Sequence, residues 1–165
     1  MSLKLNGGWS YSTQQIENLI PHLKGDSLKV LELGSGESTG KICDHFLSLF
    51  SDVVFHSFET SRKYLSNNPN VTSTLYETVE SCVLPDDTFD LILVDGPHGE
   101  VRNQWYDKLR GVSRVGTIIH IDDFCHYASF AENLDKSFKY DILDESGRSK
   151  KNQHCWRTVK VTKIL

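Results

Sequence analysis

The sequence predicts a single α/β domain in which helices cover both faces of a mostly parallel β-sheet. Two patterns support this prediction. Short apolar runs alternate with segments of helical periodicity along the chain, and residues 89–94 are almost all apolar, as expected of a central strand covered on both faces. A chain of 165 residues is long enough to bury its own core. We therefore expect one domain, with an N-terminal segment and helix (residues 1–28) followed by the core (residues 29–165).

Seven apolar runs are the expected strands of this sheet. They span residues 29–33, 53–58, 71–76, 89–94, 116–121, 140–143 and 156–163. Helices are expected at residues 13–23, with Ser12 or Thr13 as the N-cap, then from the end of the first strand to about residue 51, and at about 61–66, 101–109 and 127–137. Residues 145–154 form a polar connection, so we expect the last two runs to make a C-terminal antiparallel hairpin.

Composition and charge narrow the class of protein. The formal net charge of −4 argues against a generic nucleic-acid binder, which is usually basic. No apolar run reaches the roughly 20 residues needed to span a bilayer, and the N-terminus lacks a secretory pattern, so we expect a cytoplasmic protein with no membrane partner. The four cysteines contain no Cys-x-x-Cys pair, which predicts idle reduced thiols rather than a zinc site. Both a monomer and a homodimer remain open.

A glycine-rich turn after the first expected strand is the most informative motif. Its glycines are Gly34, Gly36 and Gly40, and a helical pattern follows at once. Glycine lacks the Cβ that would keep the backbone away from a nucleotide-like ligand. Glu32 lies two residues before Gly34, and Glu59 follows Gly34 by 25 residues, at the end of the second expected strand. These features together predict a cofactor site at the carboxyl end of the sheet.

Glu-x-Gly-x-Gly followed by an acid that ends the next strand resembles the S-adenosylmethionine (SAM) site of class I methyltransferases. Their Rossmann-like sheet has seven strands, with one late strand inserted antiparallel, and the resemblance covers nearly the whole core. It implies that Gly34, Ser35 and Gly36 lie against the amino-acid half of SAM and that Glu32 orders this loop. Glu59 would accept hydrogen bonds from the ribose hydroxyls, because both carboxylate oxygens are acceptors.

A nicotinamide dinucleotide would use the same kind of turn. Its G-x-G-x-x-G fingerprint requires a third glycine where this chain has Thr39, and Gly40 comes one residue later. Glu37, at the start of the following helix, would also repel a pyrophosphate. These details favour SAM, and an NAD-dependent oxidoreductase remains the alternative.

Three aspartates follow the fourth and fifth expected strands: Asp95, Asp122 and Asp123. Neighbouring carboxylates repel one another unless a cation joins them, and hard ions such as Mg²⁺ favour carboxylate ligands. The spacing resembles the metal-dependent O-methyltransferases of the catechol and macrolide-sugar type, which implies that all three aspartates are metal ligands. Alternatively, Asp95 contacts the methionine end of the cofactor while Asp122 and Asp123 cap the next helix.

His98 stands three residues after Asp95, where the catechol type has a lysine that takes the substrate proton. A histidine with a pKa near 6.5 could do the same at neutral pH, so His98 and Asp95 are the candidate catalytic residues. A solvent-facing loop histidine is the alternative. His120 and His126 are rivals, although His120 alternates with the apolar face of a buried strand and is expected to be structural.

The acceptor is indicated by the segment Asp-Gly-Pro-His at residues 95–98, which stands where N-methyltransferases carry Asn/Asp-Pro-Pro-Tyr. It resembles family members that act on sugars and glycans, so we expect O-methylation of a small-molecule or carbohydrate hydroxyl. Residues 148–165 hold six Lys or Arg and no acid, which leaves an RNA methyltransferase open. The short chain also leaves open a SAM-binding protein without catalysis. Residues 6–11 either fold over the cofactor edge or form an irregular lead-in.

Overall fold

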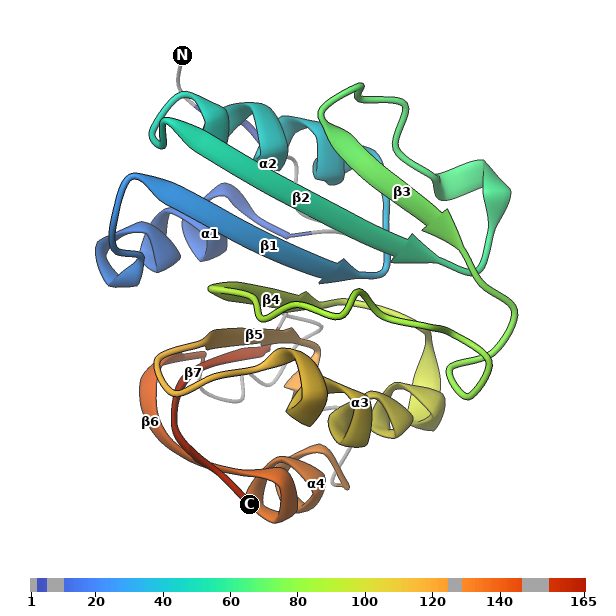
Figure 1. Ribbon diagram of the computed structural model, residues 1–165, viewed down its shortest axis with the longest axis vertical. Coiled ribbons are helices and arrows are strands. Elements are labelled where there is room, and N and C mark those ends of the chain that lie inside the picture. Colours follow the sequence, from blue (N-terminus) through green and yellow to red (C-terminus); the bar gives the residue numbers. More distant parts are fainter. Residues whose placement is uncertain (1–2, 6–10, 125–128, 147–154) are drawn as a thin grey trace.

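A seven-stranded sheet forms the centre of the computed structural model, which describes residues 3–5, 11–124, 129–146 and 155–165 (Figure 1). The strands lie in the order β3-β2-β1-β4-β5-β7-β6, and β7 is antiparallel to both of its neighbours whereas β1 to β5 pair in parallel. This confirms the expected sheet with one late antiparallel strand. The strands are β1 (Ser27–Leu33), β2 (Asp52–Glu59), β3 (Val71–Leu75), β4 (Leu91–Val94), β5 (Ile118–Asp122), β6 (Phe138–Glu145) and β7 (Trp156–Ile164).

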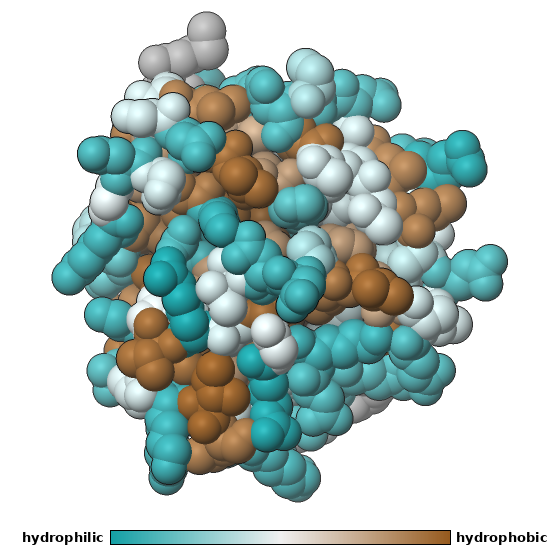
Figure 2. Space-filling view, viewed as in Figure 1, coloured by the Kyte–Doolittle hydropathy of each residue, from teal (hydrophilic) through white to brown (hydrophobic). Residues whose placement is uncertain are grey.

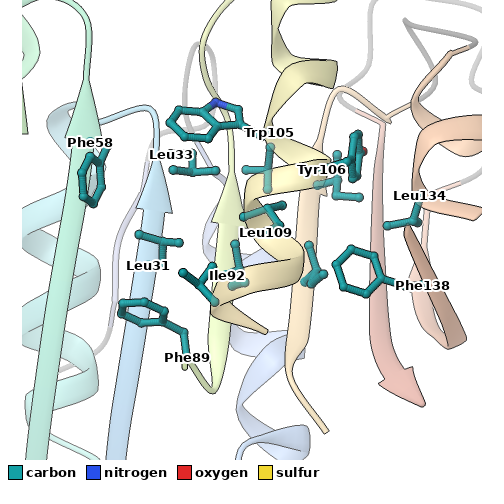
Figure 3. Close-up of a cluster of buried hydrophobic side chains, with 14 of the residues drawn as sticks. Leu31, Leu33, Phe58, Phe89, Ile92, Trp105, Tyr106, Leu109, Leu134 and Phe138 are labelled. Carbon is teal, nitrogen blue, oxygen red and sulfur yellow. The ribbon is translucent and has the colours of Figure 1, made fainter. Parts of the chain in front are cut away.

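Helices cover both faces of the sheet, and each face has its own hydrophobic cluster. Side chains alternate along β1, so Leu28 and Val30 belong to the cluster packed by α1 and α2, whereas Leu31 and Leu33 belong to the other. Figure 3 shows the second cluster, in which Leu109 of α3 lies over the sheet. The helices are α1 (Thr13–Leu19), η1 (Ile20–His22), α2 (Glu37–Leu47), η2 (Arg62–Tyr64), η3 (Gly99–Gln104), α3 (Trp105–Val112) and α4 (Ser129–Ser137).

The N-terminal helix begins as expected and ends earlier. Ser12 is its N-cap: its side chain accepts from the backbone N–H of Gln15, and the Gln15 side chain accepts from the backbone N–H of Ser12, which completes a capping box. The α-helical part ends at Leu19 and continues as the 3₁₀ turn η1, because Pro21 has no N–H for an α-helical hydrogen bond. The helix expected at residues 61–66 is likewise only one 3₁₀ turn, η2.

The cysteines do not all behave as expected. Cys43 and Cys82 are buried free thiols, in agreement with the sequence. Cys155 is disulfide-bonded to a partner outside the described residues, so the prediction of four idle thiols is wrong. Cys155 precedes β7, and its carbonyl accepts a hydrogen bond from the N–H of Phe124 at 3.0 Å. The sheet therefore brings Cys155 beside the end of β5, a proximity that spacing along the chain does not reveal.

Hydrophobic side chains reach the surface at scattered positions. The face in Figure 2 mixes hydrophilic residues with several hydrophobic patches. Among the described residues, the most exposed large hydrophobic side chains are Val83 (85%) and Val115 (68%). Scattered exposure is normal for folded proteins and does not identify a partner surface. None of the described helices has the length and apolar character needed to cross a bilayer.

Candidate functional site

The polar residues singled out in the sequence gather at one edge of the sheet. Leu33 of β1 is in register with Phe58 of β2 and with Val94 of β4, and Val94 is in register with Ile121 of β5. The residues that follow these four positions therefore begin the carboxyl edge side by side. They are Gly34, Glu59, Asp95 and Asp122. Ligands of open parallel sheets bind at this edge, so it is the candidate site.

Glycine occupies positions 34 and 36 for different structural reasons. Gly34 has φ +102°, and a Cβ built on it would lie 2.5 Å from the backbone nitrogen of Gly96, which crosses directly beside it. Trp105 supports this crossing by donating from Nε1 to the Gly96 carbonyl at 3.1 Å, and Figure 3 shows its ring beside Leu33 of β1. Gly36 is extended, and a Cβ there would meet no atom within 4 Å. Gly34 is thus required by the fold, whereas Gly36 borders open space at the start of α2.

Glu32 connects the first two strands to the glycine turn. Its side chain is fully buried, and its Oε2 accepts from Thr39 Oγ1 at 2.8 Å and from Ser57 Oγ at 2.5 Å. Thr39 in turn accepts from the N–H of Gly36 at 2.9 Å, so Glu32 orders the loop through Thr39. The other oxygen, Oε1, has no hydrogen-bond partner in the described part of the chain. Burial raises the pKa of Glu32 from 4.5 to about 7.

Glu59 also supports the loop, from the end of β2. Its Oε2 accepts from the N–H of Ser35 at 3.1 Å, and its Oε1 accepts from the N–H groups of Thr60 at 2.9 Å and Ser61 at 2.8 Å. The Thr60 hydroxyl adds a bond to Oε1 at 3.1 Å. Within the described ranges, Oε2 accepts only from Ser35 and can accept a second donor, so a hydroxyl ligand fits at this oxygen.

Arg102 organises the other half of the edge and was not singled out in the sequence. Its guanidinium is 3% exposed and donates to the carbonyls of Asp95 at 2.6 Å, Pro97 at 3.1 Å and Asp122 at 2.8 Å. It therefore ties the ends of β4 and β5 together. The Arg102 Nη2 lies 4.0 Å from the Asp95 carboxylate. Burial and the charge of Asp122 nevertheless hold the pKa of Asp95 well above its usual range.

The three aspartates reach the edge without forming a metal site. Among the described residues, no group of three or more His, Cys, Asp or Glu is arranged to hold a metal ion. Asp122 is 3% exposed and its Oδ1 accepts from Gln15 Nε2 at 2.8 Å, while Asp123 adopts φ +56° in the turn after β5. The expected set of three ligands, Asp95, Asp122 and Asp123, is therefore not assembled, because Asp122 faces α1 and the backbone turns at Asp123.

Tyr11 and Gln15 bring the N-terminal helix onto the edge. Tyr11 is the last residue of the segment 6–11 that was expected either to fold over the cofactor edge or to form an irregular lead-in; residues 6–10 lie outside the described residues, and Gln15 was not named as a site residue. Tyr11 is fully buried, and the negative charges of Asp95, Glu32 and Asp122 add to burial in raising its pKa. The pattern Ser-x-x-Gln before an apolar run could have marked Gln15 as half of a capping box. Only the folded chain shows that its amide also reaches Asp122.

The three candidate histidines have separate fates. His120 is buried on β5, its Nδ1 lies 2.9 Å from Thr158 Oγ1, and burial lowers its pKa to about 4, so it is a neutral core residue as expected. His98 is exposed on the loop after β4, where it is the N-cap of η3. His126 lies outside the described residues. His98 is thus the candidate that shares a loop with Asp95.

Comparison with known proteins identifies the fold. No protein-family model matches this sequence, and no curated protein matches it significantly. Solved structures do match: a TehB-like SAM-dependent methyltransferase from Corynebacterium glutamicum has a TM-score of 0.66 at 12% identity, covering 90% of this chain and 87% of that one. The N-methyltransferase NodS from Bradyrhizobium japonicum, in complex with S-adenosyl-L-homocysteine (SAH), has a TM-score of 0.62 at 13% identity, covering 92% and 85%.

An rRNA methylase from Streptococcus thermophilus also matches, with a TM-score of 0.59 at 12% identity, covering 92% of this chain and 96% of that one. The strand order with antiparallel β7 is the arrangement expected from the resemblance in the sequence. The chain therefore has the fold of the class I SAM-dependent methyltransferases. Because these similar structures carry such different names, the fold does not define an acceptor.

Proposed function

We propose that the protein is a SAM-dependent methyltransferase that methylates a hydroxyl oxygen of a small molecule or carbohydrate. The observation that carries the proposal is the buried, unpartnered Oε1 of Glu32, whose other oxygen is linked through Thr39 to the N–H of Gly36. A buried acceptor without a donor is costly, and a bound ligand with N–H groups would satisfy it. The fold supports the same class of cofactor.

The charges at the edge favour SAM over a dinucleotide. Glu32, Asp95 and Asp122 lie close enough to influence one another's protonation or that of Tyr11. SAM carries an ammonium and a sulfonium, which these carboxylates would attract, whereas the pyrophosphate of NAD would be repelled. We propose that the amino-acid half of the cofactor occupies the β1 and β4 ends and that Glu59 Oε2, two strands away from β4, receives the ribose hydroxyls.

The chain must also position the acceptor and remove its proton. When bound, the cofactor would supply an electrophilic methyl group, so deprotonation of the acceptor is the protein's main chemical task. Asp95 supports this role because its pKa is raised, which makes the carboxylate a stronger base than a solvated aspartate. His98 is exposed three residues further along the same loop and is the second proton acceptor that we propose.

Binding calorimetry tests the class of cofactor directly. We expect SAM and SAH to bind with a stoichiometry of one per chain and NAD to show no heat of binding. Binding of NAD without binding of SAM would overturn the proposal in favour of the oxidoreductase. A methyl-transfer assay with isotopically labelled SAM and a panel of sugars and phenols, read by mass spectrometry, would then test the hydroxyl acceptor.

RNA is the competing acceptor, because of the cationic C-terminal residues. One of these cations, Arg157, is already paired: its Nη2 lies 2.9 Å from Glu145 Oε2, and its guanidinium stacks 4.1 Å above the ring of Phe124. Together with the net charge of −4, this favours an uncharged acceptor. Retention on RNA that collapses with rising salt, and label transfer to RNA instead of small hydroxyl compounds, would overturn that choice.

A further inference from the structure

Gln15 is buried and connects the N-terminal helix to the end of β5 through hydrogen bonds. It is 1% exposed, and its two amide atoms serve different elements. Its Oε1 accepts from the N–H of Ser12 at 2.6 Å, and its Nε2 donates to Asp122 Oδ1 at 2.8 Å. The same Nε2 lies 3.5 Å from Nε2 of His120. The start of α1 is therefore held at a fixed place against the candidate site.

The hydrogen bonds of Gln15 position Tyr11. It directly precedes Ser12, it is 0% exposed, and its ring centroid lies 5.6 Å from that of His120. Its hydroxyl has no hydrogen-bond partner in the part of the chain that the structure describes. The charges that act on this hydroxyl come from Asp95 first, then Glu32 and Asp122. A buried phenol without a partner, within electrostatic reach of carboxylates of the candidate site, indicates that a ligand supplies the missing bond.

We propose that Tyr11 binds the amino-acid end of the cofactor and that Gln15 is the residue that positions it. This inference rests on the proposed function, because it takes the cofactor to be SAM. A primary ammonium has three N–H donors, and the phenol oxygen and Glu32 Oε1 are both buried acceptors without a donor. Tyr11 can also donate to a carboxylate, so it suits either charged group of an amino acid.

The test compares SAM with 5′-methylthioadenosine, which has the adenosine and sulfur but lacks the amino-acid end. Calorimetry with Tyr11→Phe should give a dissociation constant for SAM about tenfold higher than wild type, the effect of one hydrogen bond to a charged group. The dissociation constant for 5′-methylthioadenosine should stay within about twofold. A purely structural role for Tyr11 would shift both ligands together or neither, and either result would overturn the proposal.

Gln15 offers a matched control and a rescue. Gln15→Leu should weaken SAM about tenfold and leave 5′-methylthioadenosine unchanged, whereas Gln14→Leu, on the exposed neighbour, should change neither. Gln15→Glu places a second carboxylate against Asp122 and should also weaken SAM. Adding Asp122→Asn to Gln15→Glu restores a donor–acceptor pair with reversed polarity. The double variant should therefore bind SAM with a dissociation constant within about threefold of that of Asp122→Asn alone. Failure of this rescue would show that Gln15 does not act through Asp122.

The proposed function and the proposed role of Tyr11 can be contradicted separately. Wild-type protein that binds neither SAM nor 5′-methylthioadenosine would contradict the proposed function, and the inference with it. Wild-type protein that binds both ligands, combined with a Tyr11→Phe variant that loses no selectivity for SAM over 5′-methylthioadenosine, would contradict the inference alone. Circular dichroism of each variant checks that the fold is retained.

Discussion

The two halves of the sheet's carboxyl edge differ in hydrogen bonding and in charge. On the β1 and β2 side, the Glu59 carboxylate accepts four hydrogen bonds from the loops beside it, at 2.8–3.1 Å. On the β4 and β5 side, Asp95 and Asp122 are crowded together, and the nearby Arg102 uses its short hydrogen bonds on backbone carbonyls. Glu59, at the end of β2, is thus a carboxylate whose hydrogen bonds are satisfied, whereas the β4 and β5 side concentrates negative charge.

This difference assigns different tasks to the two halves. A satisfied carboxylate with one remaining acceptor position suits neutral hydroxyls, because it can add a bond without rearranging its loop. Crowded carboxylates, of which Asp95 has a raised pKa, suit a cation or a proton, because either one relieves their repulsion. SAM is neutral at its ribose and cationic at its methionine, so its own asymmetry matches that of the edge.

The largest effect should come from Gly34, where the two halves touch. Gly34→Ala places a Cβ 2.5 Å from the Gly96 nitrogen at a φ of +102°, so we expect a loss of about 3 kcal/mol or more in the free energy of unfolding. Gly36→Ala is the matched control: it meets no atom, so unfolding should change by less than about 0.5 kcal/mol while SAM binding weakens. Urea denaturation and calorimetry separate the two effects, and equal stability losses would contradict this distinction.

Glu32 should make stability depend on pH. Its pKa is raised from 4.5 to about 7 in the folded protein, so the folded state holds a proton that the unfolded state releases between these values. Stability contributed by the protonated form is fully present below pH 4.5 and is lost as the pH rises to 7. Relative to Glu32→Gln, which does not titrate, wild type should lose about 3 kcal/mol of unfolding free energy over this range. A constant difference between the two proteins from pH 4.5 to 7 would contradict the assignment.

The substitution Glu59→Ala tests the neutral half of the edge, where we place the ribose. Glu59→Ala removes the proposed acceptor of the ribose hydroxyls and should weaken SAM by about 1–3 kcal/mol. It also removes the carboxylate that binds the N–H of Ser35, so some loss of thermal stability should accompany it. Glu77→Ala, which removes an exposed acid just after β3, is the control and should alter neither property. SAM binding at wild-type strength in Glu59→Ala would show that the ribose lies elsewhere.

The smallest effect is expected from chelation. Because the described carboxylates do not form a group that holds a metal, methyl transfer should continue in the presence of a chelator. Asp122→Asn alone should change SAM affinity by less than about 1 kcal/mol, since the asparagine oxygen can still accept from Gln15 Nε2. Loss of activity with chelator, restored by Mg²⁺ or Mn²⁺, would reinstate the metal site inferred from the sequence.

The sequence predicted the fold and the neutral half of the site better than the charged half. Apolar runs and their spacing define the strands, and parallel strands necessarily gather Glu32, Glu59 and Asp95 at one edge. The break at Pro21 was not predicted, because one helix was expected over residues 13–23, although the missing N–H of proline could have indicated it. Of the two glycines Gly34 and Gly36 in the turn after β1, Gly34 has the left-handed backbone conformation and Gly36 does not. No rule of spacing distinguishes the two positions in the sequence.

The site features that the sequence did not predict depend on contacts between residues far apart in the chain. Arg102 lay within the helix expected at residues 101–109 without being singled out. Only the approach of β4 to β5 gives its guanidinium three carbonyls as hydrogen-bond acceptors. Gln15 and Asp122 are 107 residues apart, so their hydrogen bond exists only because α1 packs against the end of β5. The expected set of three metal ligands is not formed for the same reason: adjacency of Asp122 and Asp123 along the chain does not fix where their side chains point.

The most direct test of this account is a crystal structure of the protein with SAH. We expect the ribose hydroxyls at Glu59 and the amino-acid end between Glu32, Asp95 and Tyr11. A cavity of about 430 Å³ lies between α2 and the loop after β2, and its lining extends from Gly36, at the start of α2, to Lys63 and Tyr64. SAH bound in that cavity, with the carboxyl edge of the sheet left empty, would contradict the division of the edge into a neutral and a charged half.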